Sequence, residues 1–355
     1  MSDGRSMYPE KGDAQVVGLP AGLDSGRRPL TLSSLRRIKF AMSITYRRLP
    51  ILIAHMTLAL LCLGLTGCGL TVRQRAAISK FSATTTALAG QVEENLIQTR
   101  DDVVALRTGM FQLGVTGVSQ ADLDGGLDVK QLEKRLRAAA ALKRFGRLLE
   151  TLATDTQTGE LQAASDNFVT SLRQVQGVNV SDAKAEAIGQ VIAKVGGLFI
   201  EAKRKKALQS VIIESQKPLL KLADLMAEDA SPTNAAWLGL LIATDKSIQT
   251  TLARRASTVV AGSQKSAEAK WGEAEAALWQ ERYQGLQMDS AARSGSGVLI
   301  SEGTLKAIAK FRSAQEDLFV IIQSSGVSLD KIDGYYAEID ELLRLSRILS
   351  NKERK

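Results

Sequence analysis

The sequence predicts an all-α protein, an elongated antiparallel helical bundle with two or three long helices, shorter helical hairpins and no β-sheet. Three observations lead to this fold class. Only two of the six prolines, Pro218 and Pro232, lie after residue 68. That part of the chain is dominated by Ala, Leu, Gln, Lys and Glu, which are strong helix formers. Its apolar residues recur at steps of three and four, and no stretch alternates as a half-buried strand does.

The first long helix is expected from about Val72 to Leu113, where apolar and small residues share one face. That face consists of Ile78, Phe81, Thr85, Leu88, Val92, Leu96, Thr99, Val103, Leu106, Met110 and Leu113. At 1.5 Å per residue the helix is about 60 Å long. A second helix is expected from Asp128, where the spacing to Gln131 resembles a capping box, to about Asp155. A shorter third helix follows, from about Glu160 to Gln174.

A long fourth helix is expected from a cap at Ser181 or Asp182 to about Glu228. Pro218 lies in its interior and should bend it, because proline removes one backbone donor. Gly196-Gly197 costs this helix roughly 1–2 kcal/mol relative to two alanines. Close approach of a neighbouring helix explains the pair better than a hinge does, although both interpretations remain open.

The last third of the chain is expected to hold three more helices. Ser231-Pro232 has the residue types of a helix start, with Ser at the cap and Pro in the first turn. The fifth helix then extends to about Gln287, and the Gly/Ser/Ala/Arg stretch Ser290 to Gly297 reads as a linker. Residues 298–349 are expected to form a C-terminal hairpin of two helices, about Ser301–Ser324 and Ser328–Leu349.

The charge and the reactive residues are divided unevenly along the chain. The full chain has a formal charge of +8, but residues 1–68 hold nine basic and four acidic residues, so the remainder carries only +3. This small excess gives no case for nucleic-acid binding. The single His, His55, and one of the two Cys, Cys62, lie in the apolar run before Cys68.

That apolar run belongs to the feature on which the functional interpretation depends. Arg47-Arg48, a hydrophobic stretch to Gly64 and small residues before Cys68 have the three-part layout of a secretory signal. The ending Leu65-Thr66-Gly67-Cys68 resembles the lipobox of bacterial lipoproteins. The resemblance implies that signal recognition uses Arg47, Arg48, Leu65, Thr66 and Gly67, and that Cys68 is lipidated and becomes the first residue of the mature protein.

The resemblance divides the chain into a leader, a signal peptide at residues 42–67 and a mature lipid-anchored domain at residues 68–355. Residues 1–41 are either a flexible leader or the product of a start assigned too early, with Met42 as the favoured initiator. The competing interpretation of the apolar run is a plain transmembrane anchor, but the run from Leu49 to Leu65 is near the lower length limit for one. In a Gram-negative host, Gly69 after the cysteine implies transfer to the outer membrane.

Cleavage before Cys68 would leave a mature protein without His and with one lipidated Cys. This inventory excludes a disulfide, a His/Cys metal site, a Ser-His-Asp triad and a Cys-His dyad. Carboxylate pairs such as Glu93-Glu94, Asp101-Asp102 and Glu338 with Glu341 fit surface ion pairs better than a glycosidase site. We therefore expect no enzymatic activity, no cofactor and no metal, and assign little weight to a wall-active enzyme.

Three surface features remain open to a binding role. Lys203-Arg204-Lys205-Lys206 could meet anionic headgroups, but four consecutive helical residues cannot all face one surface. Trp271, Trp279 and Tyr283 could form a strip for glycan stacking, although helix packing is the commoner use of such spacing. Tyr335-Tyr336 has the same ambiguity, and adjacent residues cannot both face inward.

The sequence thus favours a lipid-anchored cell-envelope protein that acts as a non-enzymatic helical scaffold or protein-binding module. Its expected partners are the membrane, through the lipid, and an envelope protein; the oligomeric state is not predicted. The alternative is a membrane-active helical protein of the pore-forming or lysis type. Its candidate bilayer-entering segments, Ala187–Ile200 and Ala235–Ala243, are both too short to span a bilayer.

Overall fold

The computed structural model describes residues 69–353, with the exception of short gaps. These are residues 116, 126, 128, 155–157, 179–180, 182–185, 187, 191–200, 235–236, 264–268 and 325–327, and the side chains of 201–202, 252–276, 279 and 350–353 are likewise outside the description. All described residues belong to the unit that spans Thr66–Lys355. The described part is helical and contains no strand, which confirms the all-α prediction.

Seven α-helices and one 3-10 turn make up the described part of the chain. They are α2 (Val72–Gln112), η2 (Gln120–Asp122), α3 (Val129–Ala153), α4 (Thr158–Gln174), α6 (Glu201–Ala230), α7 (Leu238–Ser263), α8 (Ala269–Gln323) and α9 (Asp330–Glu353). The 55 residues of α8 extend for about 80 Å, which makes it the longest of them.

The first helix, α2, confirms its prediction almost to the residue. Thr71 caps it, because its hydroxyl accepts from the Gln74 backbone N–H while the Gln74 side chain accepts from the Thr71 N–H. The predicted stripe is buried from Ile78 to Met110, and only Leu113 at its end is partly exposed. Gly114 has a φ of 62°, a left-handed conformation that favours glycine and ends the helix.

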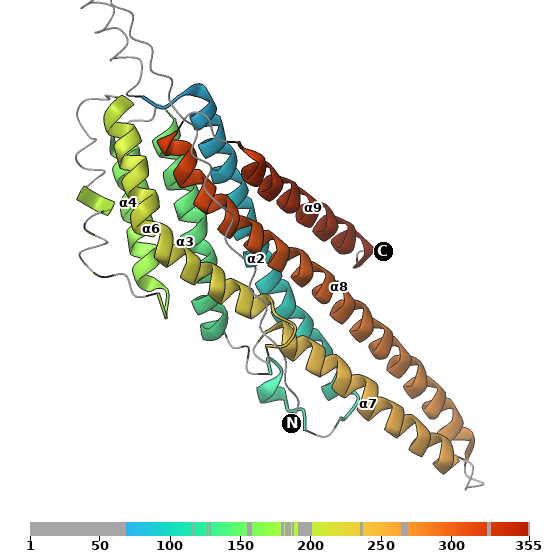
Figure 1. Ribbon diagram of the computed structural model, residues 1–355. Helices are drawn as coiled ribbons and strands as arrows, with labels where there is room; N and C mark the ends of the chain where they lie inside the picture. Colours follow the sequence, from blue (N-terminus) through green and yellow to red (C-terminus); the bar gives the residue numbers. More distant parts are fainter. Residues whose placement is uncertain are drawn as a thin grey trace, which may run out of the picture. The chain divides into compact units, whose positions relative to one another are not determined.

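The helices α2 and α8 lie antiparallel at the centre of the bundle. The Gln74 side chain donates to the carbonyl of Ile321 at 2.7 Å, and Asp102 meets Arg293 at 2.5 Å further along. The helices α7 and α9 both pack against this pair, α3 packs on α2, and α6 packs on α3 and α8. Figure 1 shows α9 running beside the C-terminal part of α8 and ending while α8 continues.

An aromatic cluster joins three helices in the core. Phe81 of α2, Phe311 of α8 and Tyr335 of α9 are fully buried, with ring centroids 5.7 to 5.9 Å apart. Burial raises the pKa of the Tyr335 hydroxyl, so Tyr335 stays neutral. Aromatic pairs at such distances stabilise the fold beyond the burial of their apolar area. This cluster therefore holds together the N-terminal part of α2, the C-terminal part of α8 and the N-terminal part of α9.

The predicted helix start at Ser231-Pro232 is wrong. Residues 231–234 instead close α6: Thr233 N–H approaches the Ser231 hydroxyl at 3.4 Å, and the Asn234 amide donates to the Glu228 carbonyl at 2.9 Å. The Asn234 side chain therefore serves a carbonyl at the end of α6, while the Ser231 hydroxyl accepts from an N–H within the turn that follows. The next helix, α7, begins at Leu238 and ends at Ser263, so the single helix predicted to Gln287 is also wrong. The predicted continuous helix from 181 to 228 falls partly outside the described residues, and Gly196-Gly197 lies wholly outside them.

The predicted linker from Ser290 to Gly297 is wrong as well, because it lies inside α8. Its small residues allow α7 to approach closely. Ser290 donates to Asp245 of α7 at 2.6 Å, and a Cβ added to Gly297 would lie 3.1 Å from Leu238 and 3.2 Å from Leu241. Tertiary contacts therefore stabilise a stretch whose residues have low intrinsic helix propensity.

Gly146 permits a similarly close crossing of α2 and α3, and this gives a first prediction. A Cβ at Gly146 would lie 2.5 Å from the Thr86 hydroxyl and 2.9 Å from the Ser82 carbonyl oxygen, which belongs to the backbone. We expect Gly146→Ala to lower the free energy of unfolding by about 1–3 kcal/mol, because the two helices must separate. Urea denaturation followed by circular dichroism measures the change.

The control is Gly90→Ala in α2, where an added Cβ meets no atom within 4 Å. Since alanine has the higher helix propensity, this substitution should stabilise the protein by up to about 1 kcal/mol. If both substitutions shift the free energy of unfolding in the same direction, the close crossing of α2 and α3 does not require glycine at position 146.

Candidate helix-docking groove

One side of the α2–α8 pair holds α9 in a channel between the two helices. Lys80 of α2 forms an ion pair with Asp333 at 2.6 Å, and the Gln91 amide donates to Ser346 at 3.2 Å. Leu342 of α9 packs directly on Gly303 of α8, since a Cβ added to Gly303 would lie 2.9 Å from the Cδ1 atom of Leu342. Both α2 contacts advance in the same direction along α9, so α9 runs parallel to α2.

The same side of both helices continues beyond the α9 contacts. Eighteen residues make five turns of an α-helix, so a residue eighteen positions away lies on the same face about 27 Å along the axis. On α2 this step leads from Gln91 to Gly109, and on α8 it leads back from Gly303 to Gly285. Gly109 and Leu286 are in contact, so the two faces are again adjacent there.

A groove of about 590 Å³ lies at this position. We call it the α2–α8 groove. Its lining residues are Ala105, Thr108, Gly109, Gln112 and Leu113 of α2 with Arg282, Gly285, Leu286 and Asp289 of α8. Six of them are small or apolar, while Gln112, Arg282 and Asp289 are polar or charged. A Cβ added to Gly285 would meet no atom within 4 Å. Internal packing therefore does not explain why α8 has glycine at this exposed helical position, where it costs about 1 kcal/mol relative to alanine.

An ion network fixes the end of the groove nearer to α9. Arg293 donates from Nε to both carboxylate oxygens of Asp289 at 2.9 Å and from Nη1 to buried Asp102 at 2.5 Å. The Gln98 amide also donates to Asp102, at 3.0 Å. Burial disfavours the charged guanidinium, but the hydrogen bonds to the two carboxylates outweigh it and raise the pKa of Arg293. This network connects α2 to α8 at this end of the groove.

A second, smaller hollow lies where α2, α8 and the α6–α7 connection meet. This cavity of about 50 Å³ is lined by Asp229 and Trp237 among others. Arg135 donates to Asp229 at 2.8 Å and lies 4.8 Å from the centre of the Trp237 ring. Burial raises the pKa of the Asp229 carboxyl, and Arg135 offsets part of this effect. The cavity has room for about three waters, and the arrangement ties α3 to the end of α6.

The residues that the sequence assigned to lipidation and signal recognition lie outside the described residues. This applies to Cys68, Arg47, Arg48, Leu65, Thr66 and Gly67 alike. Their assignment stays a prediction.

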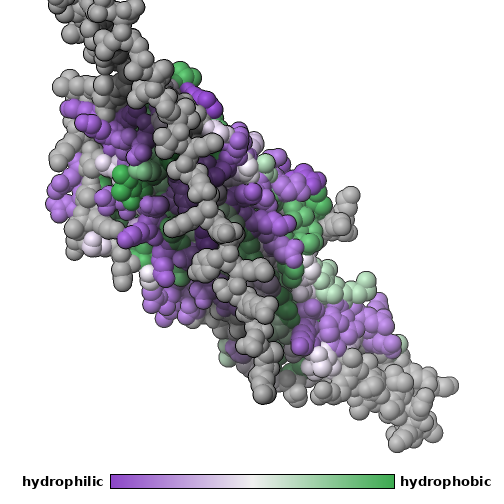
Figure 2. Space-filling view, in the orientation of Figure 1, coloured by the Kyte–Doolittle hydropathy of each residue, from purple (hydrophilic) through white to green (hydrophobic). Residues whose placement is uncertain are grey.

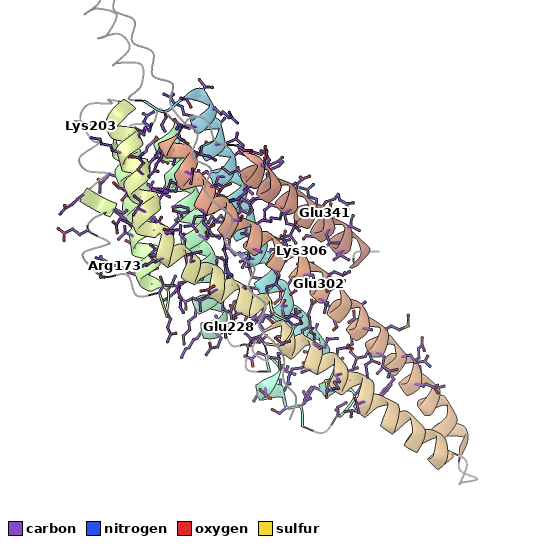
Figure 3. All side chains as sticks on the ribbon, in the orientation of Figure 1. Arg173, Lys203, Glu228, Glu302, Lys306 and Glu341 are labelled. Atoms are coloured by element: carbon purple, nitrogen blue, oxygen red, sulfur yellow. The ribbon has the colours of Figure 1, made fainter. Side chains whose placement is uncertain are left out.

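Neighbouring side chains of the basic cluster and of the tyrosine pair face different surroundings, as their spacing on a helix predicted. In the cluster 203–206, Arg204 is buried while Lys203, near the start of α6 in Figure 3, is exposed. Tyr335 is buried and Tyr336 is 48% exposed. Tyr283 of α8 is buried, which fits helix packing rather than a glycan platform. The side chains of Trp271 and Trp279 lie outside the description.

The carboxylate pairs each divide between different surroundings. Glu93 meets Lys143 at 3.3 Å, and Glu341 of α9 pairs with Arg344 at 2.7 Å on an exposed surface. In the pair Asp101-Asp102 the first side chain is exposed and the second is buried against Arg293. On the face of the molecule that Figure 2 shows, hydrophilic residues make up much of the described surface, and apolar residues form smaller patches.

Sequence reasoning did not find the α2–α8 groove. The signal was present, since Gly109 and Gly285 are glycines inside helices with neither a turn nor a hinge to explain them. It was hidden because the stretch Ser290 to Gly297 was interpreted as a linker, so the first part of α8 was assigned to the helix before it and not to the partner of α2.

Comparison of the chain with protein-family models, with curated proteins and with solved structures found no match. Within the described residues, no helix combines the length and apolar character needed to cross a bilayer. That part of the chain also holds no group of three or more His, Cys, Asp or Glu side chains arranged to bind a metal ion. The groove is therefore interpreted from its own geometry and chemistry.

Proposed function

We propose that this protein is a lipid-anchored cell-envelope protein whose helical domain acts as a non-enzymatic protein-binding module. The α2–α8 groove is the observation that carries the binding role. It is an open channel of about 590 Å³ between two long helices, and it continues a channel that already holds a helix of this chain. The Leu65-Thr66-Gly67-Cys68 pattern supports the lipid anchor.

Two features of the bundle fit such a role. Long helices obtain most of their stability from partner helices, and among the described residues α2 and α8 have a helical partner on this side only as far as α9 extends. A lipid on Cys68 would also connect to the bundle through very few residues, because α2 begins at Val72. In a Gram-negative cell the module would face the periplasm from the outer membrane.

The test is the substitution Cys68→Ser, followed by cell fractionation and mass spectrometry of the mature protein. We expect loss of the lipid, with either release from the membrane fraction or accumulation of an uncleaved precursor. Cys62→Ser is the matched control, because Cys62 lies within the same apolar run and should leave processing unchanged. Normal processing and membrane attachment of the Cys68→Ser protein would contradict the proposal.

The membrane-active alternative gains no support from the described residues. In the candidate bilayer-entering segment 235–243, Trp237, Leu238 and Leu241 are buried in the bundle core. Such a segment would have to leave the core before it entered a membrane. Leakage of a dye from liposomes exposed to the purified protein would favour the alternative over the binding module.

A further inference from the structure

We propose that the α2–α8 groove binds a short amphipathic α-helix of a partner protein, in the orientation parallel to α2. This inference rests on the proposed function and names the class of partner. The occupant is a helix of about two turns with one apolar face and an acidic residue near its C-terminal end.

Continuity with the α9 contact is the first argument. In that contact the channel between α2 and α8 accepts an amphipathic helix whose buried face holds Ile332, Tyr335, Ile339 and Leu342. The contact uses Leu342 against a glycine of α8, Gly303. The groove offers Gly285 on the same face of α8, eighteen residues earlier, so a leucine or similar side chain of a second helix has an equivalent place to pack.

The size of the groove is the second argument. On α2 its lining extends from Ala105 to Leu113, which is about 12 Å along a helix and fits roughly eight residues of an occupant. Glycine at position 285 lets the backbone of an incoming helix approach closely.

Charge sets the orientation. Arg282 is exposed at the end of the groove away from α9 and forms no ion pair with a described residue. The end nearer to α9 holds Asp289, whose carboxylate is in contact with Arg293. A helix parallel to α2 would bring its C-terminal end, which carries partial negative charge, toward Arg282. An acidic side chain there would strengthen the same contact.

The experiment uses the full chain, purified in a detergent buffer, which does not depend on a lipid anchor. The probe is a fluorescently labelled synthetic peptide with the sequence of residues 330–353, which is an amphipathic helix that this channel already accepts. Binding is measured by fluorescence anisotropy for the unsubstituted protein, Gly285→Leu and Gly295→Leu. Gly295 is the control because it is an exposed glycine of α8 with no atom within 4 Å of an added Cβ, and it does not line the groove.

We expect Gly285→Leu to weaken peptide binding at least tenfold, because the leucine fills the groove, and Gly295→Leu to leave it unchanged. Neither substitution should reduce the thermal unfolding temperature, since both replace an open helical glycine. Equal affinities for all three proteins, or no binding to any of them, would overturn the inference. Self-association that Gly285→Leu abolishes would also overturn it, because the occupant would then be a second copy of this chain. These results are independent of the fractionation of Cys68→Ser, so failure of the groove and failure of the lipid anchor can be told apart.

Discussion

Replacing Phe81 by alanine should lower the free energy of unfolding by about 3–5 kcal/mol. Phe81 is fully buried between Phe311 and Tyr335, at centroid distances of 5.8 and 5.7 Å. The substitution removes a whole ring from a packed interior and leaves a cavity that three different helices would have to close. Urea denaturation followed by circular dichroism at 222 nm measures the loss.

Phe111→Ala is the matched control for Phe81→Ala. It makes the same change in the same helix, but Phe111 is 41% exposed. Because less apolar area is buried and no enclosed cavity forms, we expect a loss below about 1 kcal/mol. A similar loss for both substitutions would show that the aromatic cluster does not hold α2, α8 and α9 together.

The contrast between these two residues also shows why α2 could be predicted so closely. Its apolar face repeats without interruption from Ile78 to Met110, and every member of that face is buried. Phe111 does not belong to this face, and its side chain is exposed. A regular stripe bounded by a cap and a glycine therefore contains nearly all the information that defines a long amphipathic helix.

The course of α8 was not predicted, because contacts with other helices override its local helix propensity. Between Ser290 and Gly297 the sequence has the small residues of a linker, yet Ser290 bonds to Asp245 and Gly297 lies against Leu238. Those partners are forty to sixty residues away in sequence, so no local window can reveal them. The groove was missed for a related reason, because its wall on α8, from Arg282 to Asp289, ends directly before this stretch and was predicted to close a different helix.

Polar contacts between distant helices were equally hidden from the sequence. The pair Asp101-Asp102 predicts two surface carboxylates, and one of them is indeed exposed. The other is buried because Arg293 lies opposite it, on a helix whose register could not be known from the sequence alone.

Arg293→Met should lower the free energy of unfolding by about 2–4 kcal/mol. The Asp102 side chain is only 6% exposed, and methionine would remove the cation that meets it at 2.5 Å. Breaking a buried ion pair from one side costs about 3–5 kcal/mol, and the lower range allows for solvent at the partly exposed Arg293. Asp102→Asn in the Arg293→Met background should recover most of the loss, because it removes the buried charge while keeping the shape of the side chain.

A double-substitution cycle of Arg293→Met and Asp102→Asn separates the ion pair from the packing of the arginine stem. The control is Arg312→Met, also in α8, which removes the partner of Asp224 from an exposed pair at 2.7 Å. Exposed pairs contribute at most about 1 kcal/mol, so this change should be small. Equal losses for Arg293→Met and Arg312→Met, or no recovery by Asp102→Asn, would mean that lost packing rather than the buried charge determines the effect. The α2–α8 groove would then depend on helix packing alone for the separation of its two walls.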